Sequence, residues 1–172
     1  MARPLKIPLF FQPRGKPYCG PACLKMVLSF YGQKNTLKKL VSRLPMDETG
    51  IDMCAMGLLF LRMGLSPLIY IDSAVAENSV YREIIPKFIN NGGEIIIRPV
   101  RIRDIRQAIS DKYPVILHIL NSDRGEHFVV VRNMGNKKAT INDPLLGVME
   151  LDIKKMMEDR HDWSAGAIVV RP

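Results

Sequence analysis

Hydrophobic positions in the first two thirds of the chain recur mostly at helical spacing. Residues 19–31 carry one apolar stripe with Gly32 placed to end it, which predicts a helix. By the same criterion we expect further helices over residues 35–45, 51–64, 79–93 (interrupted at Pro86) and 102–113. Two short apolar runs, residues 66–72 and 94–100, are predicted to be strands that lie between these helices in the sequence.

The last third changes to short β-type runs separated by Gly, Asn and Asp turns. We expect strands over residues 114–120, 126–134, 137–144, 147–152 and 164–172, with one helix over 153–161. Helices first and antiparallel strands last indicate an α+β fold, with N-terminal helices packed on one side of a C-terminal antiparallel sheet. No repeat or linker divides the chain, so residues 1–172 are predicted to form a single domain.

The composition is that of an ordinary globular protein, with 47% hydrophobic and 24% charged residues. No segment approaches the roughly 20 apolar residues of a membrane span. The prolines of the N-terminal segment and the missing small-residue cleavage site argue against a secretory signal. We therefore expect a cytoplasmic protein with no stable membrane insertion.

The net charge of +8 raises the possibility of a nucleic-acid partner. Lysines and arginines are spread over the chain, densest in "RPVRIRDIR" (residues 98–106). There is no zinc-finger spacing, no aromatic stacking signature and no tail of like charges. We expect a solvated basic face and no nucleic acid; steeply salt-dependent binding to DNA or RNA would indicate otherwise.

Cys19, Cys23 and Cys54 are an odd number of cysteines, which argues against a disulfide framework and suits a reducing compartment. Cys19 and Cys23 lie four residues apart without a second pair to complete a zinc site. We expect no metal and no cofactor.

Cys19 lies at the predicted start of the first helix. Unsatisfied backbone N–H groups and the positive end of the helix dipole favour thiolate there, and thiolate is the nucleophilic form. Gly20 allows a substrate to approach the backbone closely, and Pro21 suits a first helical turn. Considered alone, a lone cysteine is more often a small buried residue.

Activation of a cysteine needs a base, and the chain has three histidines. His118 lies within an apolar run and is expected to be a sheet or core residue, whereas His161 is expected at the surface near a helix end. His127 begins a predicted strand, and Asp143 ends the next one. Antiparallel pairing would bring His127 and Asp143 side by side, so that the carboxylate holds the imidazole in one tautomer.

Gln12 lies seven positions before Cys19. Its side-chain amide could donate to a developing oxyanion, with the backbone N–H of Cys19 as second donor. A polar loop residue is the alternative role for Gln12, a turn residue before proline is the alternative for Asp143, and an ordinary strand histidine is the alternative for His127.

"FFQ…YCGPACLKMVLSFYG", "EHFVVV" and "INDPLLG" occur in an order that resembles the C39 peptidases, a papain-like cysteine peptidase family. Many members are the N-terminal domain of bacterial ABC exporters and remove double-glycine leader peptides. The resemblance implies a papain-like fold, with Cys19 as nucleophile, His127 as general base, Asp143 as orienting residue and Gln12 as oxyanion donor; Cys23 matches a core position. Gln12 departs from the family by one position, since six is the usual interval.

The resemblance implies a cysteine peptidase that hydrolyses peptide bonds, with leader peptides as one class of substrate. Transporter domains are not in the sequence, so a partner ABC exporter would be encoded separately. Two alternatives stay open: a non-catalytic papain-like module that binds peptides, and an amide hydrolase or transferase of the same fold.

Overall fold

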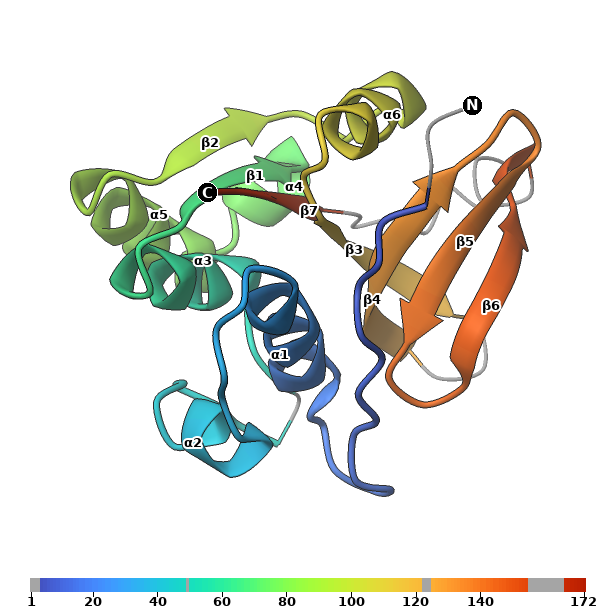
Figure 1. Cartoon of the computed structure of the whole chain (residues 1–172). Helices are drawn as coiled ribbons and strands as arrows, with labels where there is room; N and C mark the ends of the chain where they lie inside the picture. Colours follow the sequence, from blue (N-terminus) through green and yellow to red (C-terminus); the bar gives the residue numbers. More distant parts are fainter. Residues whose placement is uncertain (1–3, 49, 122–124, 155–165) are drawn as a thin grey trace.

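The computed structural model describes residues 4–48, 50–121, 125–154 and 166–172, which form an α+β structure as predicted (Figure 1). Its helices are α1 (Cys19–Phe30), α2 (Leu37–Val41), α3 (Met53–Arg62), α4 (Ser73–Ala76), α5 (Ser79–Asn90) and α6 (Ile102–Ser110). Its strands are β1 (Ser66–Ile71), β2 (Glu94–Ile97), β3 (Val115–Asn121), β4 (Gly125–Met134), β5 (Lys138–Asp143), β6 (Gly147–Asp152) and β7 (Ala167–Arg171).

All seven strands join one sheet in the order β2-β1-β7-β3-β4-β5-β6. β1 and β2 pair in parallel, connected through α4 and α5, and the other neighbours are antiparallel. The C-terminal strand β7 lies between β1 and β3 and joins the two halves of the chain in one sheet. The antiparallel sheet predicted for the last third therefore also takes in two strands from the first half.

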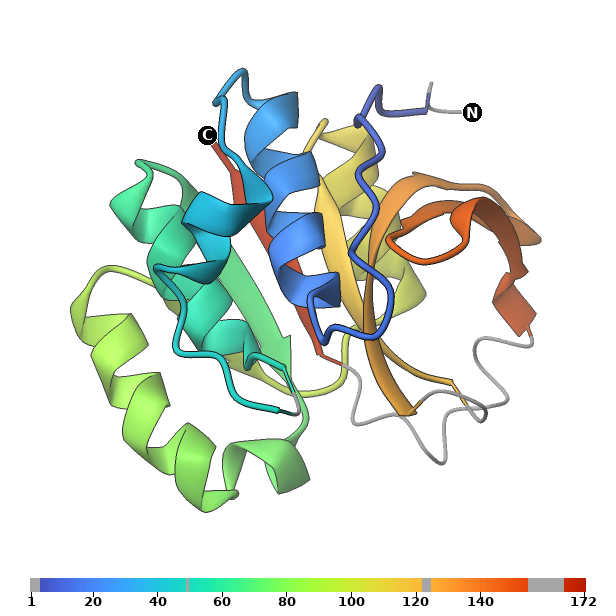
Figure 2. The same cartoon turned by 90° about the horizontal axis from the view of Figure 1, so that it is seen from below.

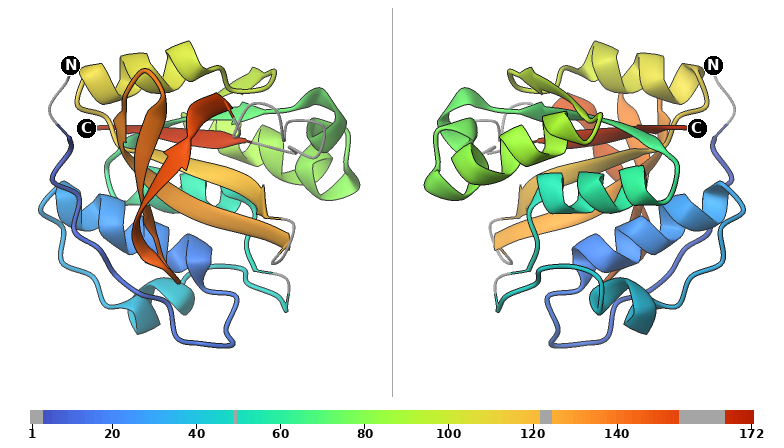
Figure 3. Two further views of the ribbon diagram at one scale, coloured as in Figure 1. Left: turned by 90° about the vertical axis from the view of Figure 1, so that its right-hand side faces the viewer. Right: turned by 90° about the vertical axis from the view of Figure 1, so that its left-hand side faces the viewer.

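Helices cover both faces of the sheet rather than the one face predicted. α1 and α3 pack on one face, and α6 lies across the sheet from them (Figure 3). α5 packs outside α3 and against β2. In the described part of the chain, no helix is both long and apolar enough to cross a bilayer.

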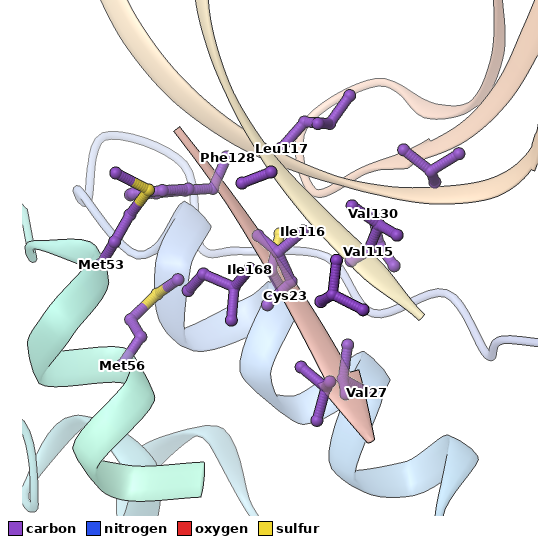
Figure 4. Close-up of a cluster of buried hydrophobic side chains, with 14 of the residues drawn as sticks. Cys23, Val27, Met53, Met56, Val115, Ile116, Leu117, Phe128, Val130 and Ile168 are labelled. Atoms are coloured by element: carbon purple, nitrogen blue, oxygen red, sulfur yellow. The ribbon is translucent and has the colours of Figure 1, made fainter. Parts of the chain in front are cut away.

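The core beneath α1 fixes the position of that helix. Cys23 and Val27 of α1 face Ile116 and Val130 of the sheet, and all four side chains are fully buried (Figure 4). Burying an aliphatic side chain stabilises a fold by about 1.5–3 kcal/mol. The helix that begins at Cys19 is thus anchored along its length.

An extended N-terminal segment, residues 4–12, runs between α1 and the strands β4 and β5 (Figure 2); we call it the N-terminal strap. The Leu5 N–H donates to the Arg132 carbonyl (2.8 Å). The Asn142 side-chain Nδ2 donates to the Ile7 carbonyl (3.2 Å). These bonds tie the strap to two neighbouring strands.

Two helix predictions need comment. The predicted interruption at Pro86 is wrong, because α5 continues through it. A proline removes one backbone donor and crowds the preceding turn, and burial of Phe88 on the same helix offsets that cost. The helix predicted over residues 153–161 lies outside the described residues except for its first two positions.

Candidate active site

Cys19 is the first residue of α1, and its side chain is partly exposed, whereas Cys23 and Cys54 are buried. The N-cap residue, Tyr18, makes no side-chain capping bond, and the first turn of α1 contains no acidic residue. No side chain of the cap or of the first turn therefore neutralises the N–H groups and the positive dipole end of the helix. A helix N-terminus of this kind attracts negative charge.

Gly20 has a packing role in the structure. The residue is buried, and a Cβ on it would lie 2.5 Å from Ile51 Cγ2 and 2.9 Å from Met56 Sδ. Only glycine lets the segment before α3 approach the first turn of α1 this closely. Gly20 thus helps to set the position of Cys19.

His127 and Asp143 form a buried pair. His127 Nε2 lies 3.1 Å from Asp143 Oδ1, and each side chain is 6% exposed. The pairing of Val130 with Asn142 puts Asp143 opposite Val129, two residues along β4 from His127. The two side chains therefore meet diagonally across neighbouring strands, a spacing that long side chains can bridge.

The carboxylate of Asp143 is also held by the turn that follows it. Its Oδ1 accepts hydrogen bonds from the backbone N–H groups of Leu145 (2.7 Å) and Leu146 (3.1 Å). Burial favours the neutral carboxyl, but the bonds from His127 and Leu145 outweigh it and hold the pKa of Asp143 below its usual value. We therefore assign Asp143 as ionised.

The side chain of Cys19 lies close enough to His127 to raise the pKa of its imidazole. Because Nε2 faces Asp143, Nδ1 is the nitrogen left for the sulfur. Burial lowers the pKa of His127, but the bond to Asp143, the nearby side chain of Cys19 and the negative charges of both groups raise it to about 9. An imidazolium between a carboxylate and a sulfur suits nucleophilic catalysis. In this arrangement a thiolate can attack an electrophile, and the imidazolium can then donate its proton to the leaving group.

Gln12 is held next to the residue that follows Asp143, since its backbone N–H donates to the Pro144 carbonyl (3.0 Å). Its side-chain Nε2 donates to the Lys16 carbonyl (2.8 Å), and its Oε1 is buried without a hydrogen-bond partner. An amide nitrogen carries two hydrogens, so one remains available. The strap thus brings Gln12 to the end of β5 that carries Asp143.

The remaining candidates lie elsewhere. His118 is on β3, 9% exposed, and stacks on Phe128 with ring centroids 4.6 Å apart, as expected of a sheet histidine. Cys23 is fully buried, and burial, together with the charges of Cys19 and Asp143, raises its pKa well above the usual value. His161 lies outside the described residues.

The sequence prediction missed the backbone N–H groups of Leu145 and Leu146 as partners of Asp143. An aspartate followed by proline and then by glycine is typical of a turn in which the carboxylate accepts backbone bonds, so "DPLLG" contained that signal. Among the described residues, no cluster of three or more His, Cys, Asp or Glu side chains is placed to hold a metal ion.

Comparison with known proteins identifies one family and several solved structures of similar fold. The family model described as "Peptidase_C39 like family" matches residues 4–165. No curated protein matches the chain significantly.

Three solved structures are similar over nearly the whole chain. One is a double glycine motif protease from an AMS/PCAT transporter in complex with the leader peptide (20% identity, 98% of this chain and 94% of that chain, TM-score 0.63). Another is the peptidase domain of Streptococcus ComA, a bifunctional ABC transporter of a quorum-sensing pathway (19% identity, covering 95% of this chain and 97% of that chain, TM-score 0.63). A third is a protein from Bacillus anthracis assigned as a C39-like peptidase (13% identity, covering 100% of this chain and 98% of that chain, TM-score 0.68).

At these identities the similarity establishes the fold, and the predicted papain-like architecture is confirmed.

Proposed function

The chain belongs to the Peptidase_C39 like family, and we propose that it is a cysteine peptidase with Cys19 as nucleophile, His127 as general base and acid, and Asp143 as orienting residue. The observation that carries the proposal is the position of His127, which is 3.1 Å from the Asp143 carboxylate and has the Cys19 side chain near enough to raise its pKa. Family and fold support peptidase function in general. The assignment of roles is ours.

In the first half of the reaction the Cys19 sulfur attacks the carbonyl carbon of the scissile peptide bond. A C–S bond forms, and the carbonyl oxygen becomes an oxyanion. His127 then gives its proton to the amide nitrogen as the C–N bond breaks, so the leaving group departs as a neutral amine. A thioester remains on Cys19.

In the second half, His127, now neutral, takes a proton from water as the water oxygen attacks the thioester. The C–S bond breaks, a carboxylic acid is released, and the thiolate–imidazolium pair is restored. Asp143 holds the same imidazole nitrogen throughout, so Nδ1 stays directed at the sulfur.

Two donors would stabilise the oxyanion. The backbone N–H of Cys19 lies at the uncapped start of α1. The second hydrogen of Gln12 Nε2 is the other candidate, because the strap holds this residue beside the end of β5. Such donors act on the charge that develops in the transition state.

A peptide is the proposed substrate, and leader peptides are one candidate class. One structural relative is a double glycine motif protease in complex with a leader peptide, and another is a domain of an ABC transporter. By analogy, this chain would act in the cytoplasm in association with an ABC exporter. Hydrolysis or transfer of another amide would follow the same route as far as the thioester, and analysis of the products distinguishes these reactions.

Alkylation of the protein with iodoacetamide at pH 7 tests the proposal. We expect Cys19 to react at least about tenfold faster than glutathione, because the thiolate is the reactive form. His127→Gln should slow the reaction to near the glutathione rate. His118→Gln removes another buried sheet histidine and should leave the rate unchanged.

A Cys19 rate equal to that of glutathione and insensitive to His127→Gln would contradict the proposed pairing. Cleavage is measured separately on a proteome-derived peptide mixture, with Cys19→Ala as the inactive control. Absence of cleavage by the wild-type protein would rule out a general peptidase.

A further inference from the structure

An exposed apolar surface adjoins the proposed site. Six large hydrophobic side chains of the described residues are strongly exposed, and three of them lie near Gln12 and Asp143. These are Phe11 (59% exposed), Leu146 (46%) and Val148 (53%). We call these three residues the apolar corner.

The apolar corner is continuous across the strap and the turn between β5 and β6. Gly147, between Leu146 and Val148, is buried, and a Cβ on it would lie 3.7 Å from the Phe11 ring and 3.8 Å from Leu9. Phe11 thus lies over the glycine that separates the other two residues. Phe11, although distant in sequence, therefore lies against the turn that carries Leu146 and Val148.

Hydrogen bonds of the proposed site hold this surface in place. Asp143 Oδ1 accepts the N–H of Leu146 at 3.1 Å, so the carboxylate that orients His127 also fixes the backbone of the apolar corner. The Gln12 N–H donates to the Pro144 carbonyl, which fixes Phe11 against the same turn. The exposed apolar side chains are therefore presented at a set place.

The two segments that carry the apolar corner have no charged side chain of their own. The segments Leu9–Gln12 and Pro144–Met149 contain no ionisable residue, although the chain as a whole has a net charge of +8. Covering this surface with an apolar group would desolvate no charge from either segment. It is suited to an apolar side chain rather than to an ionic one.

The proposed reaction gives the direction of the substrate. His127 protonates the leaving nitrogen, so the chain that follows this nitrogen must pass His127. The turn after Asp143 and the end of the strap border His127 on the side of its carboxylate. We propose that the apolar corner is the subsite for an apolar side chain of the peptide on the leaving-group side of the cleaved bond. This inference rests on the proposed peptidase function.

The test uses a proteome-derived peptide mixture with blocked amino groups, in which each cleavage exposes one new amine. Sequencing the new N-termini gives the residues on the leaving-group side. We expect the wild-type protein to select an apolar residue at one of the first three positions. Leu146→Ser and Phe11→Ser should each reduce cleavage of those peptides by about tenfold relative to peptides with polar residues there.

Ile89→Ser is the matched control, since Ile89 is 50% exposed on α5; the selection should be unchanged. Iodoacetamide labelling of Cys19 is measured on all variants and should also be unchanged, which separates loss of a subsite from damage to the reactive group.

Cleavage with no apolar selection on the leaving-group side, or with selection that survives both Leu146→Ser and Phe11→Ser, would overturn the inference and leave the peptidase function standing. Equal product patterns from wild type and Cys19→Ala would overturn both.

Discussion

His127 Nε2 is 3.1 Å from Asp143 Oδ1 although the two residues are not directly opposite each other on β4 and β5. The pair is buried, and the carboxylate oxygen is shared with two backbone N–H groups of the following turn. The imidazole is therefore oriented by the folded chain itself, before any substrate binds.

Asp143→Asn should remove the charge while keeping the shape. An Asn Oδ1 can accept the same bonds from His127 and from the backbone N–H groups of Leu145 and Leu146. We expect kcat for peptide cleavage to fall by about a hundredfold or more. The pKa of His127, now about 9, should fall towards its ordinary value, which NMR titration of the imidazole measures.

Asp72→Asn is the control, because Asp72 caps α4 through a bond to the Ala74 N–H that Asn can also accept. This substitution should change neither kcat for peptide cleavage nor the pKa of His127. A wild-type value of kcat in Asp143→Asn would contradict the orienting role.

Protonation of His127 should make the stability of the protein depend on pH. Its pKa is raised from 6.5 to about 9 in the folded state, so its contribution is complete below pH 6.5 and is lost as the pH rises through about 9. The lowered pKa of Asp143 acts at the other end: its contribution is present above about pH 4 and is lost as the pH falls further.

Urea unfolding of wild type and His127→Gln at several pH values measures this effect. The difference in unfolding free energy should be larger at pH 6 than at pH 10, by roughly 3 kcal/mol. A difference that does not change between pH 6 and pH 10 would mean that the pair is not ionic.

Local sequence signals predicted most of the elements because local physics sets them. The apolar stripe of residues 19–31 became α1, which is buried on that stripe. Thr36, near the predicted start of the second helix, caps α2 by accepting from the Lys39 N–H (3.2 Å). The alternating and continuous apolar runs of the last third became β3 to β7.

The arrangement of the site depended on contacts that no local pattern encodes. The diagonal meeting of His127 and Asp143 follows from the register of β4 and β5, which includes a bulge between Val131 and Asn133. The packing of Gly20 against Ile51 depends on how α3 meets α1. The strap that carries Gln12 belongs to no helix or strand, and its place is set by bonds to β4 and β5.

Gly20→Ala should be destabilising, because its Cβ would lie 2.5 Å from Ile51 Cγ2. We expect a loss of about 1–3 kcal/mol in unfolding free energy and slower alkylation of the neighbouring Cys19. Ile51→Ala removes the methyl group that the new Cβ would meet.

The double variant Gly20→Ala/Ile51→Ala should therefore lose less unfolding free energy than the two single variants lose in sum, by at least about 1 kcal/mol. Urea unfolding of all four proteins completes the cycle. Additivity within about 0.5 kcal/mol would show that the two positions do not compete for space.

Gln12→Ala should separate oxyanion stabilisation from thiol reactivity. Removing one oxyanion donor costs about a hundred- to a thousandfold in kcat, and we expect a loss of this size in peptide cleavage. Alkylation of Cys19 by iodoacetamide proceeds at a saturated carbon and forms no oxyanion, so its rate should stay within about twofold of wild type. Gln33→Ala is the control, because Gln33 Nε2 donates to the Met63 carbonyl (2.9 Å) in a comparable amide bond away from Cys19. If cleavage and alkylation fall together, Gln12 supports the loop before α1 rather than the transition state.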